Sequence, residues 1–525
     1  MTSTTPRRRS RAIDLAAYGT DLDEFFAEVG EEYHAGHSGR AASTEVAPIY
    51  ERHARLFDSA AIAALGRAAQ GDGDEARQAR RLRGLAVESH LGRSVAGLTD
   101  RIFAAEASAV VVWRGERIPY RQVPRRVAEA ADRAERNILE ASYCEALEAI
   151  NPLRLERLER MRDAASELGF DDLVAAADAI NGFDSAALAG ELQAFLSASE
   201  TVYFAALRRY LAEIDIEAGD GSIADLRHLL RASSWDPWFE SRRLVPLLTE
   251  TLGQLGIDLA SQTNVQLDME ERPTKSPRAF AIGVRIPQDV RMVMQPHGGH
   301  DDYRTALHEI GHVQHFAHTD AALPAADRHA GDASLTEAYA DLLQGLASEP
   351  AWLAGHLGMP EPEVLGFVDF AAFRRLYLMR RYAAKLLYEL RLLREPDPGI
   401  GRATYAGMLG LLTGVKTPEA SWLADVDDHL YAARYLRAWM ISASMASALR
   451  AEFGARWWTE RAAGDRLRAL WAQGQRPSGE DVLAQLGYDQ LDWRPILHQI
   501  RTQLIGELSG YGGPNITTRA GTRKV

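Results

Sequence analysis

The residues best suited to chemistry in this 525-residue chain are two histidines four positions apart, His308 and His312, with Glu309 directly after the first. Side chains four residues apart on a helix project from one face, so both imidazoles can bind a single metal ion. Zn²⁺ prefers such nitrogen ligands at about 2.0–2.1 Å in tetrahedral geometry, and a catalytic site leaves one position for water. A bound ion can lower the pKa of that water to about 7, so Glu309 is a strong enough base to take its proton. The pattern HExxH therefore predicts a zinc centre that activates water.

The residues before the motif favour a helix. The segment 296–300 contains a proline and two glycines that interrupt regular structure. Asp301 and Asp302 then offer N-cap side chains for a helix that starts near Tyr303. Gly311 is a poor helix former and costs about 1 kcal/mol relative to alanine. We interpret it as leaving room beside a metal or a substrate.

Two interpretations compete for the third protein ligand. In the first, His318 completes the pattern HExxHxxHxxH, but His315 stands where the metzincin pattern needs a glycine to turn the chain. On a continuing helix, which rises about 1.5 Å per residue, His318 is too far along the axis to reach the ion bound by the first two histidines. In the second, a new helix opens at Asp332 and carries Glu337 as the ligand, with Asp341 one turn later to accept the second ring N–H of a zinc histidine. The sequence favours the second interpretation.

Simpler roles exist for each of these residues taken alone. Glu337 and Asp341 are typical of a solvated helix face, and His315 and His318 of packing side chains. Unrelated polar surface residues would rarely produce HExxH followed by ExxxD on the next helix. We therefore expect one Zn²⁺ per chain, held by both histidines of the motif and by Glu337.

Three segments of the chain resemble a known class of enzymes. Residues 308–315 and 330–341 are similar to the zinc core of gluzincin metallopeptidases, namely the angiotensin-converting-enzyme family and the thimet oligopeptidase-like peptidases. Residues 431–440 are similar to the segment in which those families carry a tyrosine that hydrogen-bonds the developing oxyanion. The likeness extends more faintly from about residue 50 to residue 500.

The resemblance implies a role for each matching residue. Zinc is bound by His308, His312 and Glu337, Glu309 is the general base and then the acid, Asp341 supports a ligand, and Tyr435 stabilises the transition state. It also implies two helical lobes that face each other across a deep channel with zinc at its floor.

The chain departs from both families near this tyrosine. The converting-enzyme register has a histidine where this chain has Asp425, and His429 is the nearest candidate for its catalytic role. The thimet-like register has a further tyrosine at Ala438, and the loss of one oxyanion donor typically costs about 10² to 10³ in rate. Arg434 and Tyr431 are the remaining candidates for substrate contact in this segment.

The rest of the chain predicts a mainly helical protein. Apolar residues recur at helical spacing over residues 44–218, 365–393 and 428–453. Two short hairpins are expected, one at 110–113 with 117–120 and one at 279–286 with 290–295. The second lies just before the zinc helix, where a peptide can add to its edge beside Ala279 and Phe280.

These elements suggest a division into four parts. We expect an N-terminal tail and first helix at 1–43, a helical lobe at 44–222, a zinc-binding catalytic region at 223–508 and a flexible tail at 509–525. The expected fold class is therefore mainly α, a two-lobed helical metallopeptidase with a deep central channel and a small β-hairpin beside the zinc helix.

Composition restricts the binding partners and the cellular compartment that we expect for this protein. A net charge of −13 and a pI near 5.7 argue against nucleic acid, which binds clustered cations. The chain contains no uncharged apolar stretch of about 18 residues, so we expect no membrane span. The basic run 7–11 is more typical of a tail than of an export signal. The single cysteine, Cys144, fits a reducing cytoplasm.

The sequence thus leads to one principal hypothesis and two alternatives. The principal one is a zinc metallopeptidase that hydrolyses peptide bonds in short unfolded peptides through a water activated by Glu309. A related enzyme would cleave an amide in a specialised metabolite or modified peptide. A non-catalytic relative would bind a peptide and keep zinc only as a structural element.

Overall fold

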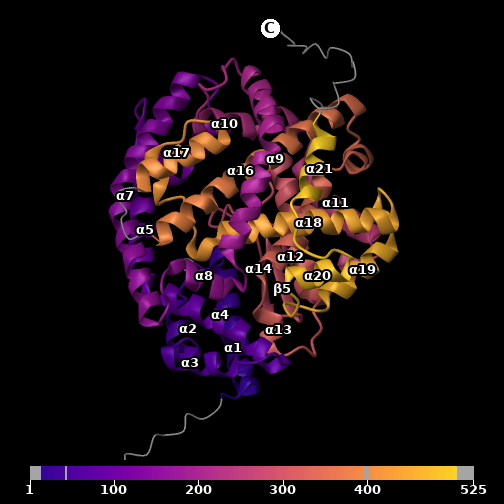
Figure 1. The fold of residues 1–525 in the computed structure, drawn as a ribbon. Coiled ribbons are helices and arrows are strands. Elements are labelled where there is room, and N and C mark those ends of the chain that lie inside the picture. The colour runs from indigo at the N-terminus through magenta and orange to yellow at the C-terminus, as the bar shows by residue number, and fades with distance from the viewer. Residues whose placement is uncertain (1–12, 42–43, 395–400, 505–525) are drawn as a thin grey trace, which may run out of the picture.

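The computed structural model describes residues 13–41, 44–394 and 401–504, and these fold mainly as α-helix (Figure 1). The helices are α1 (Leu15–His37), α2 (Ala47–Arg52), α3 (Ser59–Ala68), α4 (Asp74–Ser94), α5 (Ala96–Ser108), α6 (Val123–Glu129), α7 (Arg133–Glu167), α8 (Leu173–Asn181), α9 (Ser185–Ala212), α10 (Ile223–Arg231), α11 (Leu244–Gln254), α12 (His300–His318), α13 (Ala325–His329), α14 (Ala333–Gln344), α15 (Pro350–Trp352), α16 (Glu361–Arg394), α17 (Gly401–Thr413), α18 (Tyr431–Phe453), α19 (Arg461–Trp471), α20 (Gly479–Gln485) and α21 (Arg494–Gln503). The strands are β1 (Val110–Trp113), β2 (Glu116–Pro119), β3 (Val265–Asp268), β4 (Phe280–Arg285) and β5 (Asp289–Val293). The basic run 7–11 and the tail 509–525 lie outside the described residues.

Helix α14 lies at the centre of the molecule, with α1 to α4 on one side of it and α9, α16 and α21 on the other in the view of Figure 1. It begins at Asp332, whose side chain accepts the backbone N–H of Ser334 at 2.9 Å. Every residue from Ser334 to Leu343 is buried, and the helix packs most extensively against α12 and α18. Because a buried charge needs a partner, the carboxylates of Glu337 and Asp341 on this helix must be paired or bind a metal.

The hairpin predicted before the HExxH helix is confirmed, and it belongs to a larger sheet. Strands β4 and β5 pair antiparallel, and β3 adds parallel to β5, giving the order β3-β5-β4. Helix α1 packs on one face, where a side chain at Gly30 would meet Val284. Helix α12 packs on the other face. The edge strand β4 is thereby held beside the helix that carries the HExxH motif.

The second predicted hairpin, β1 with β2, is also confirmed. Arg114 and Gly115 connect its strands and both have positive φ, as a type I′ turn requires. The hairpin covers a small apolar cluster of its own, whereas the main core runs through the molecule from Tyr18 to Leu504. The helices around α14 are therefore recruited from most of the chain. The division at residues 222 and 223 stays a prediction.

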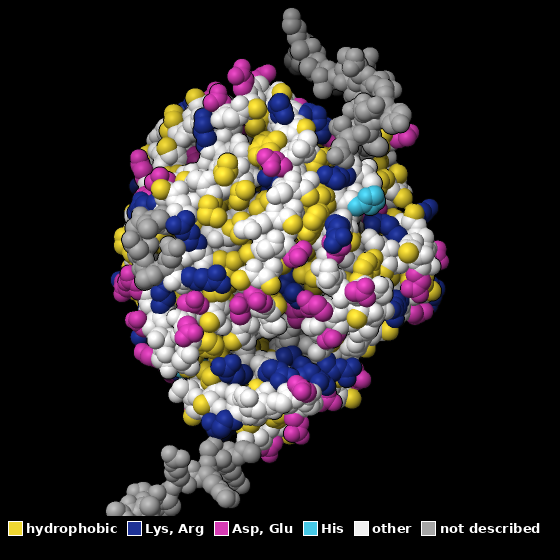
Figure 2. All heavy atoms as spheres, viewed as in Figure 1, with side chains coloured by type: hydrophobic (Ala, Val, Ile, Leu, Met, Phe, Trp, Pro, Cys, Tyr) yellow, Lys and Arg dark blue, Asp and Glu magenta, His cyan; other side chains and the backbone are white. Residues whose placement is uncertain are grey.

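Charged side chains of both signs are spread over the face shown in Figure 2, and a group of Lys and Arg side chains gathers in its lower part. Among the described residues, no helix combines the length and the apolar character needed to cross a lipid bilayer.

Gly311 is the point of closest approach between α12 and α14. A Cβ at this position would lie 2.6 Å from Ala340 Cα and 3.0 Å from Tyr339 O. The interpretation that Gly311 leaves room beside a metal or substrate is wrong, because the backbone of α14 fills that space. The missing side chain lets the two helices that carry HExxH and Glu337 come together.

We expect Gly311→Ala to lower the free energy of unfolding by about 1–3 kcal/mol, the usual cost of overpacking a core. The clash is with backbone, so α12 must move away from α14. Chemical denaturation measures the loss. Gly345→Ala is the matched control, since a Cβ there meets no atom within 4 Å. Equal stability of the two variants would contradict this account of the helix contact.

Candidate metal centre

Helix α12 starts three residues earlier than predicted. It covers His300–His318, and its N-cap is Gly299 with φ 94°. Asp302 lies in the first turn and is not the N-cap. Its carboxylate accepts the backbone N–H groups of His297 and Gly298 at 2.6 and 2.7 Å. This folds the preceding loop back onto the helix and fixes where the helix begins.

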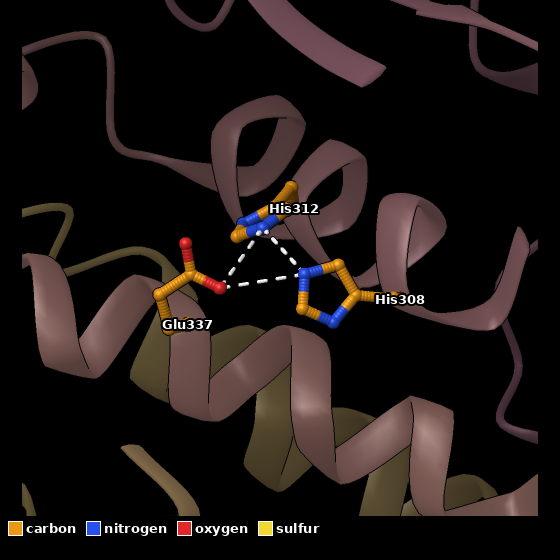
Figure 3. A group of neighbouring side chains, drawn as sticks. All are labelled: His308, His312 and Glu337. Atoms are coloured by element: carbon orange, nitrogen blue, oxygen red, sulfur yellow. Dashed lines mark hydrogen bonds and ion pairs between the residues drawn. The ribbon is translucent and has the colours of Figure 1, made fainter. Parts of the chain in front are cut away.

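Two turns later, α12 presents His308 and His312 to Glu337 of α14 (Figure 3). The two Nε2 atoms are 3.2 Å apart, and Glu337 Oε2 lies 3.3 Å from Nε2 of His308 and 3.7 Å from Nε2 of His312. A tetrahedral zinc site with bonds of about 2.0–2.1 Å has ligand atoms about 3.3–3.4 Å apart. The spacing of the three donor atoms therefore fits a single ion bound among them.

The protonation of these groups also suits a metal ion. Burial lowers the pKa of His312 to about 4, so the ring is neutral at pH 7. Burial raises the pKa of Glu337, but the hydrogen bond from His308 and the charges of both histidines outweigh it and hold the pKa at about 2. Burial lowers the pKa of His308, but the hydrogen bond and the charge of Glu337 outweigh this effect and leave the pKa above its ordinary value. A zinc ion binds neutral imidazole and ionised carboxylate, so it would take the place of the hydrogen bond between them.

Tyr431 of α18 orients the carboxylate of Glu337. Its hydroxyl donates to Glu337 Oε1 at 2.8 Å, which leaves Oε2 for the two imidazoles. The Arg434 guanidinium lies 4.9 Å over the Tyr431 ring and donates to Asn181 Oδ1 at 2.6 Å. The contact with Arg434 thus helps to fix the position of the Tyr431 ring. Tyr431 was predicted to contact substrate, and the structure places it against a candidate metal ligand.

We expect Tyr431→Phe to weaken zinc binding about tenfold, since partners of a ligand typically contribute 10- to 100-fold to affinity. Competition with a chromogenic chelator measures the change. Tyr435→Phe is the control, because it removes a hydroxyl from the same helix without removing the hydrogen bond to Glu337. Unchanged affinity in Tyr431→Phe would show that Glu337 needs no support from this hydroxyl.

Glu309 lies between the two histidines in sequence but points to the sheet rather than into the ligand set. Burial raises the pKa of its carboxyl, and the charge of His308 and the backbone N–H of Ala281 offset part of this effect. Ala281 is on the edge strand β4. The candidate base is therefore next to the strand along which a peptide backbone can lie.

Tyr435 is one turn after Tyr431 and faces the same site. The charges of Glu337 and Glu309 contribute to a raised pKa of its phenol, after burial, which is the larger cause. Its ring contacts Tyr431, Tyr382 and Trp439 at centroid distances of 5.0, 5.8 and 6.1 Å. These four rings from α16 and α18 form an aromatic wall that reaches Glu337 at Tyr431.

The predicted role of Asp341 is wrong. Its two carboxylate oxygens accept a pair of hydrogen bonds from Arg375 at 2.6 and 2.5 Å. Among the described residues, the buried Nδ1 atoms of His308 and His312 have no hydrogen-bond partner. Asp341 pairs with the partly exposed Arg375 guanidinium and does not fix a histidine tautomer.

His429 is not brought to the metal centre in the structure. It has φ 54°, its backbone oxygen accepts from Asn181 at 2.9 Å, and its side chain lines a different cavity with Arg157 and Asp428. Asp425, at the position of the family histidine, is paired with Arg381 at 2.7 Å. The catalytic role predicted for His429 therefore has no geometric support.

Two side chains that were predicted to contact substrate instead contact other residues of the protein. Arg434 is buried and binds Asn181 and Glu88. The Phe280 ring packs on His37 of α1 at 5.0 Å, and Ala279 lies just before β4. Any contact from this part of the edge strand to a substrate would have to come from its backbone.

His315 and His318, in the last two turns of α12, have structural partners. His315 is fully buried, with Nε2 3.2 Å from Gly474 O, and His318 Nδ1 lies 2.9 Å from Gln314 O. The His318 ring packs on Trp471. Neither histidine is in the group of donor atoms that could hold a metal, so the geometry favours Glu337 over His318 as third ligand.

Ala281, Tyr382 and Arg375 belong to the surroundings of the site but could not be predicted from the sequence. The first acts through a backbone N–H, which no side-chain pattern reveals. Tyr382 and Arg375 lie within the long helix α16, where no motif marks them as part of a site. Only the contact of α16 with α18 brings them to the site.

Comparison with protein-family models finds no match, and comparison with curated proteins finds no relative.

Proposed function

We propose that this protein is a zinc-dependent metallopeptidase of the gluzincin type. The observation that carries the proposal is the convergence of His308, His312 and Glu337 on a space the size of one ion, with Glu309 beside it. The site is partly open, since the side chains of the two histidines are 20% and 13% exposed. A structural zinc site is normally closed by a fourth protein ligand, and among the described residues none joins these three.

Each residue of the site would have its own role in peptide hydrolysis. When bound, zinc supplies a Lewis acid that polarises the amide carbonyl and lowers the pKa of the attacking water. Glu309 takes the proton of that water and returns it to the leaving amine. The Tyr435 hydroxyl donates to the oxygen on which negative charge develops, and its raised pKa keeps it protonated at neutral pH. Tyr431 keeps Glu337 in its ligand orientation.

Short unfolded peptides are the substrates that this arrangement suits best. The edge strand β4 offers backbone groups to an extended chain, whatever its side chains. Aromatic rings from α16 and α18 can pack against those side chains. We infer that the helices around the centre form two lobes with a channel between them, which would exclude folded proteins.

Zinc stoichiometry and peptide turnover together test the proposal. We expect one zinc per chain and hydrolysis of a quenched-fluorescence library of random short peptides, with no hydrolysis after chelation and recovery on adding zinc. Bound zinc without turnover of any peptide would favour a non-catalytic peptide binder. Turnover of small amides alone would favour an amide hydrolase that acts on a metabolite.

We expect Tyr435→Phe to lower kcat about 10²-fold with little change in KM, because the lost hydrogen bond forms mainly in the transition state. Steady-state kinetics on one cleaved peptide measure both constants. Tyr382→Phe is the control, since that ring contacts Tyr435 rather than the ligand set. A fall in kcat that is equal in both variants would assign the effect to the aromatic wall instead of the Tyr435 hydroxyl.

A further inference from the structure

A cavity of about 330 Å³ lies between α7, α10, α16 and α17. Four tyrosines, Tyr143, Tyr377, Tyr382 and Tyr405, form much of its wall, together with leucines of α10, α16 and α17. A cavity of about 150 Å³ is enough to bind a benzene ring. The space is therefore large enough for an aromatic side chain.

Tyr382, in the wall of the cavity, is linked to the candidate metal centre by a series of ring contacts. The ring of Tyr382 lies 5.8 Å from that of Tyr435 and 5.1 Å from that of Trp439, edge to face in both cases. Tyr435 in turn contacts Tyr431, which is hydrogen-bonded to Glu337. An extended peptide advances about 3.3–3.6 Å per residue, so a side chain roughly two to four residues from the cleaved bond can cover this path.

The Asp425 carboxylate in the wall of the cavity is paired. Arg381 donates to both of its oxygens at 2.7 and 2.9 Å. Arg227 is 3.5 Å from the Glu140 carboxylate through Nε, and its guanidinium lies 6.0 Å from the centroid of the Tyr143 ring. A cationic group entering this space would lose water without gaining a free carboxylate. A neutral ring, by contrast, finds aromatic edges and aliphatic side chains.

We propose that this cavity is a specificity pocket that receives an aromatic side chain of the substrate peptide, about two to four residues from the cleaved bond. The inference rests on the proposed peptidase function. It adds a preference that the metal centre alone does not impose, since that centre acts on the backbone.

Binding of defined peptides to the zinc-loaded Glu309→Gln protein tests the pocket without turnover. A single Phe is moved along a Gly/Ser peptide of eight residues, and affinity is measured by calorimetry. We expect one position to bind about ten- to a hundredfold more tightly than the all-Gly/Ser peptide, as burial of a Phe side chain predicts. Equal affinity at all positions would overturn the proposal.

Two substitutions in the Glu309→Gln background fill the cavity from different walls, Leu230→Trp on α10 and Ser421→Phe before α18. Both positions are partly exposed, and we expect both changes to abolish the preference for Phe. Thr99→Trp is the matched control in a separate cavity of about 300 Å³ and should keep the preference. Thermal unfolding verifies that each variant folds. If the preference survives in every folded filling variant, the pocket lies elsewhere and the proposal fails.

The same peptides separate this proposal from the proposed function. They are also incubated with the unmodified zinc-loaded protein. Phe-dependent binding without cleavage would support the pocket and reject the peptidase. Cleavage with no dependence on Phe would support the peptidase and reject the pocket.

Discussion

Replacing Glu309 by glutamine should lower peptide hydrolysis by about 10² to 10⁴, the usual contribution of a positioned acid and base. Glutamine has nearly the same shape but cannot take a proton from water at neutral pH. The loss should fall on kcat, because Glu309 acts on the reacting water and not on the bound peptide. Single-turnover kinetics with a cleaved peptide measure the chemical step directly.

The fold and the metal should survive this change. Glu309 is not in the group of donor atoms, so zinc content should stay at one per chain. Glu271→Gln, at an exposed loop position before β4, is the matched control and should keep full activity. If Glu309→Gln retained zinc, fold and undiminished hydrolysis, another group would have to be the base and the proposed mechanism would be wrong.

The parts of the site that local spacing controls could be predicted from the sequence. His308 and His312 are four residues apart, and a helix places them together whatever surrounds it. Glu337 follows on the next helix, which begins at a recognisable N-cap, Asp332. The β4–β5 hairpin could be predicted because its two strands are consecutive, whereas β3 was missed because its parallel partner β5 lies more than 20 residues later.

The parts that depend on contacts between distant segments could not be predicted. Asp341 was assigned to a zinc histidine on spacing alone, but Arg375 on α16 takes both of its oxygens. His429 was proposed from its position before Tyr435, yet its left-handed backbone belongs to a loop that packs on α8. Tyr431 bonds to Glu337 across 94 positions of sequence. Such pairings follow from how α14, α16 and α18 pack, which no local pattern specifies.

Loss of a ligand should have the largest effect on both zinc and stability. We expect His312→Ala to abolish stoichiometric zinc binding and peptide hydrolysis. At a free zinc concentration of about 1,000 times Kd, binding stabilises the folded state by about 4 kcal/mol. For 525 residues this corresponds to a zinc-dependent rise in Tm of about 4 °C, given an unfolding entropy of about 2.1 cal/mol/K per residue. The variant should lose this rise.

Comparing each variant with and without zinc removes the separate cost of the cavity that the alanine leaves. Glu337→Gln and His318→Ala then test which residue is the third ligand, since each removes one of the two candidates. The geometry predicts that Glu337→Gln loses most of the zinc-dependent rise in Tm and that His318→Ala keeps it, because His318 packs on Trp471. The opposite result would make His318 the ligand and would mean that α12 turns away from its helical path when the ion binds.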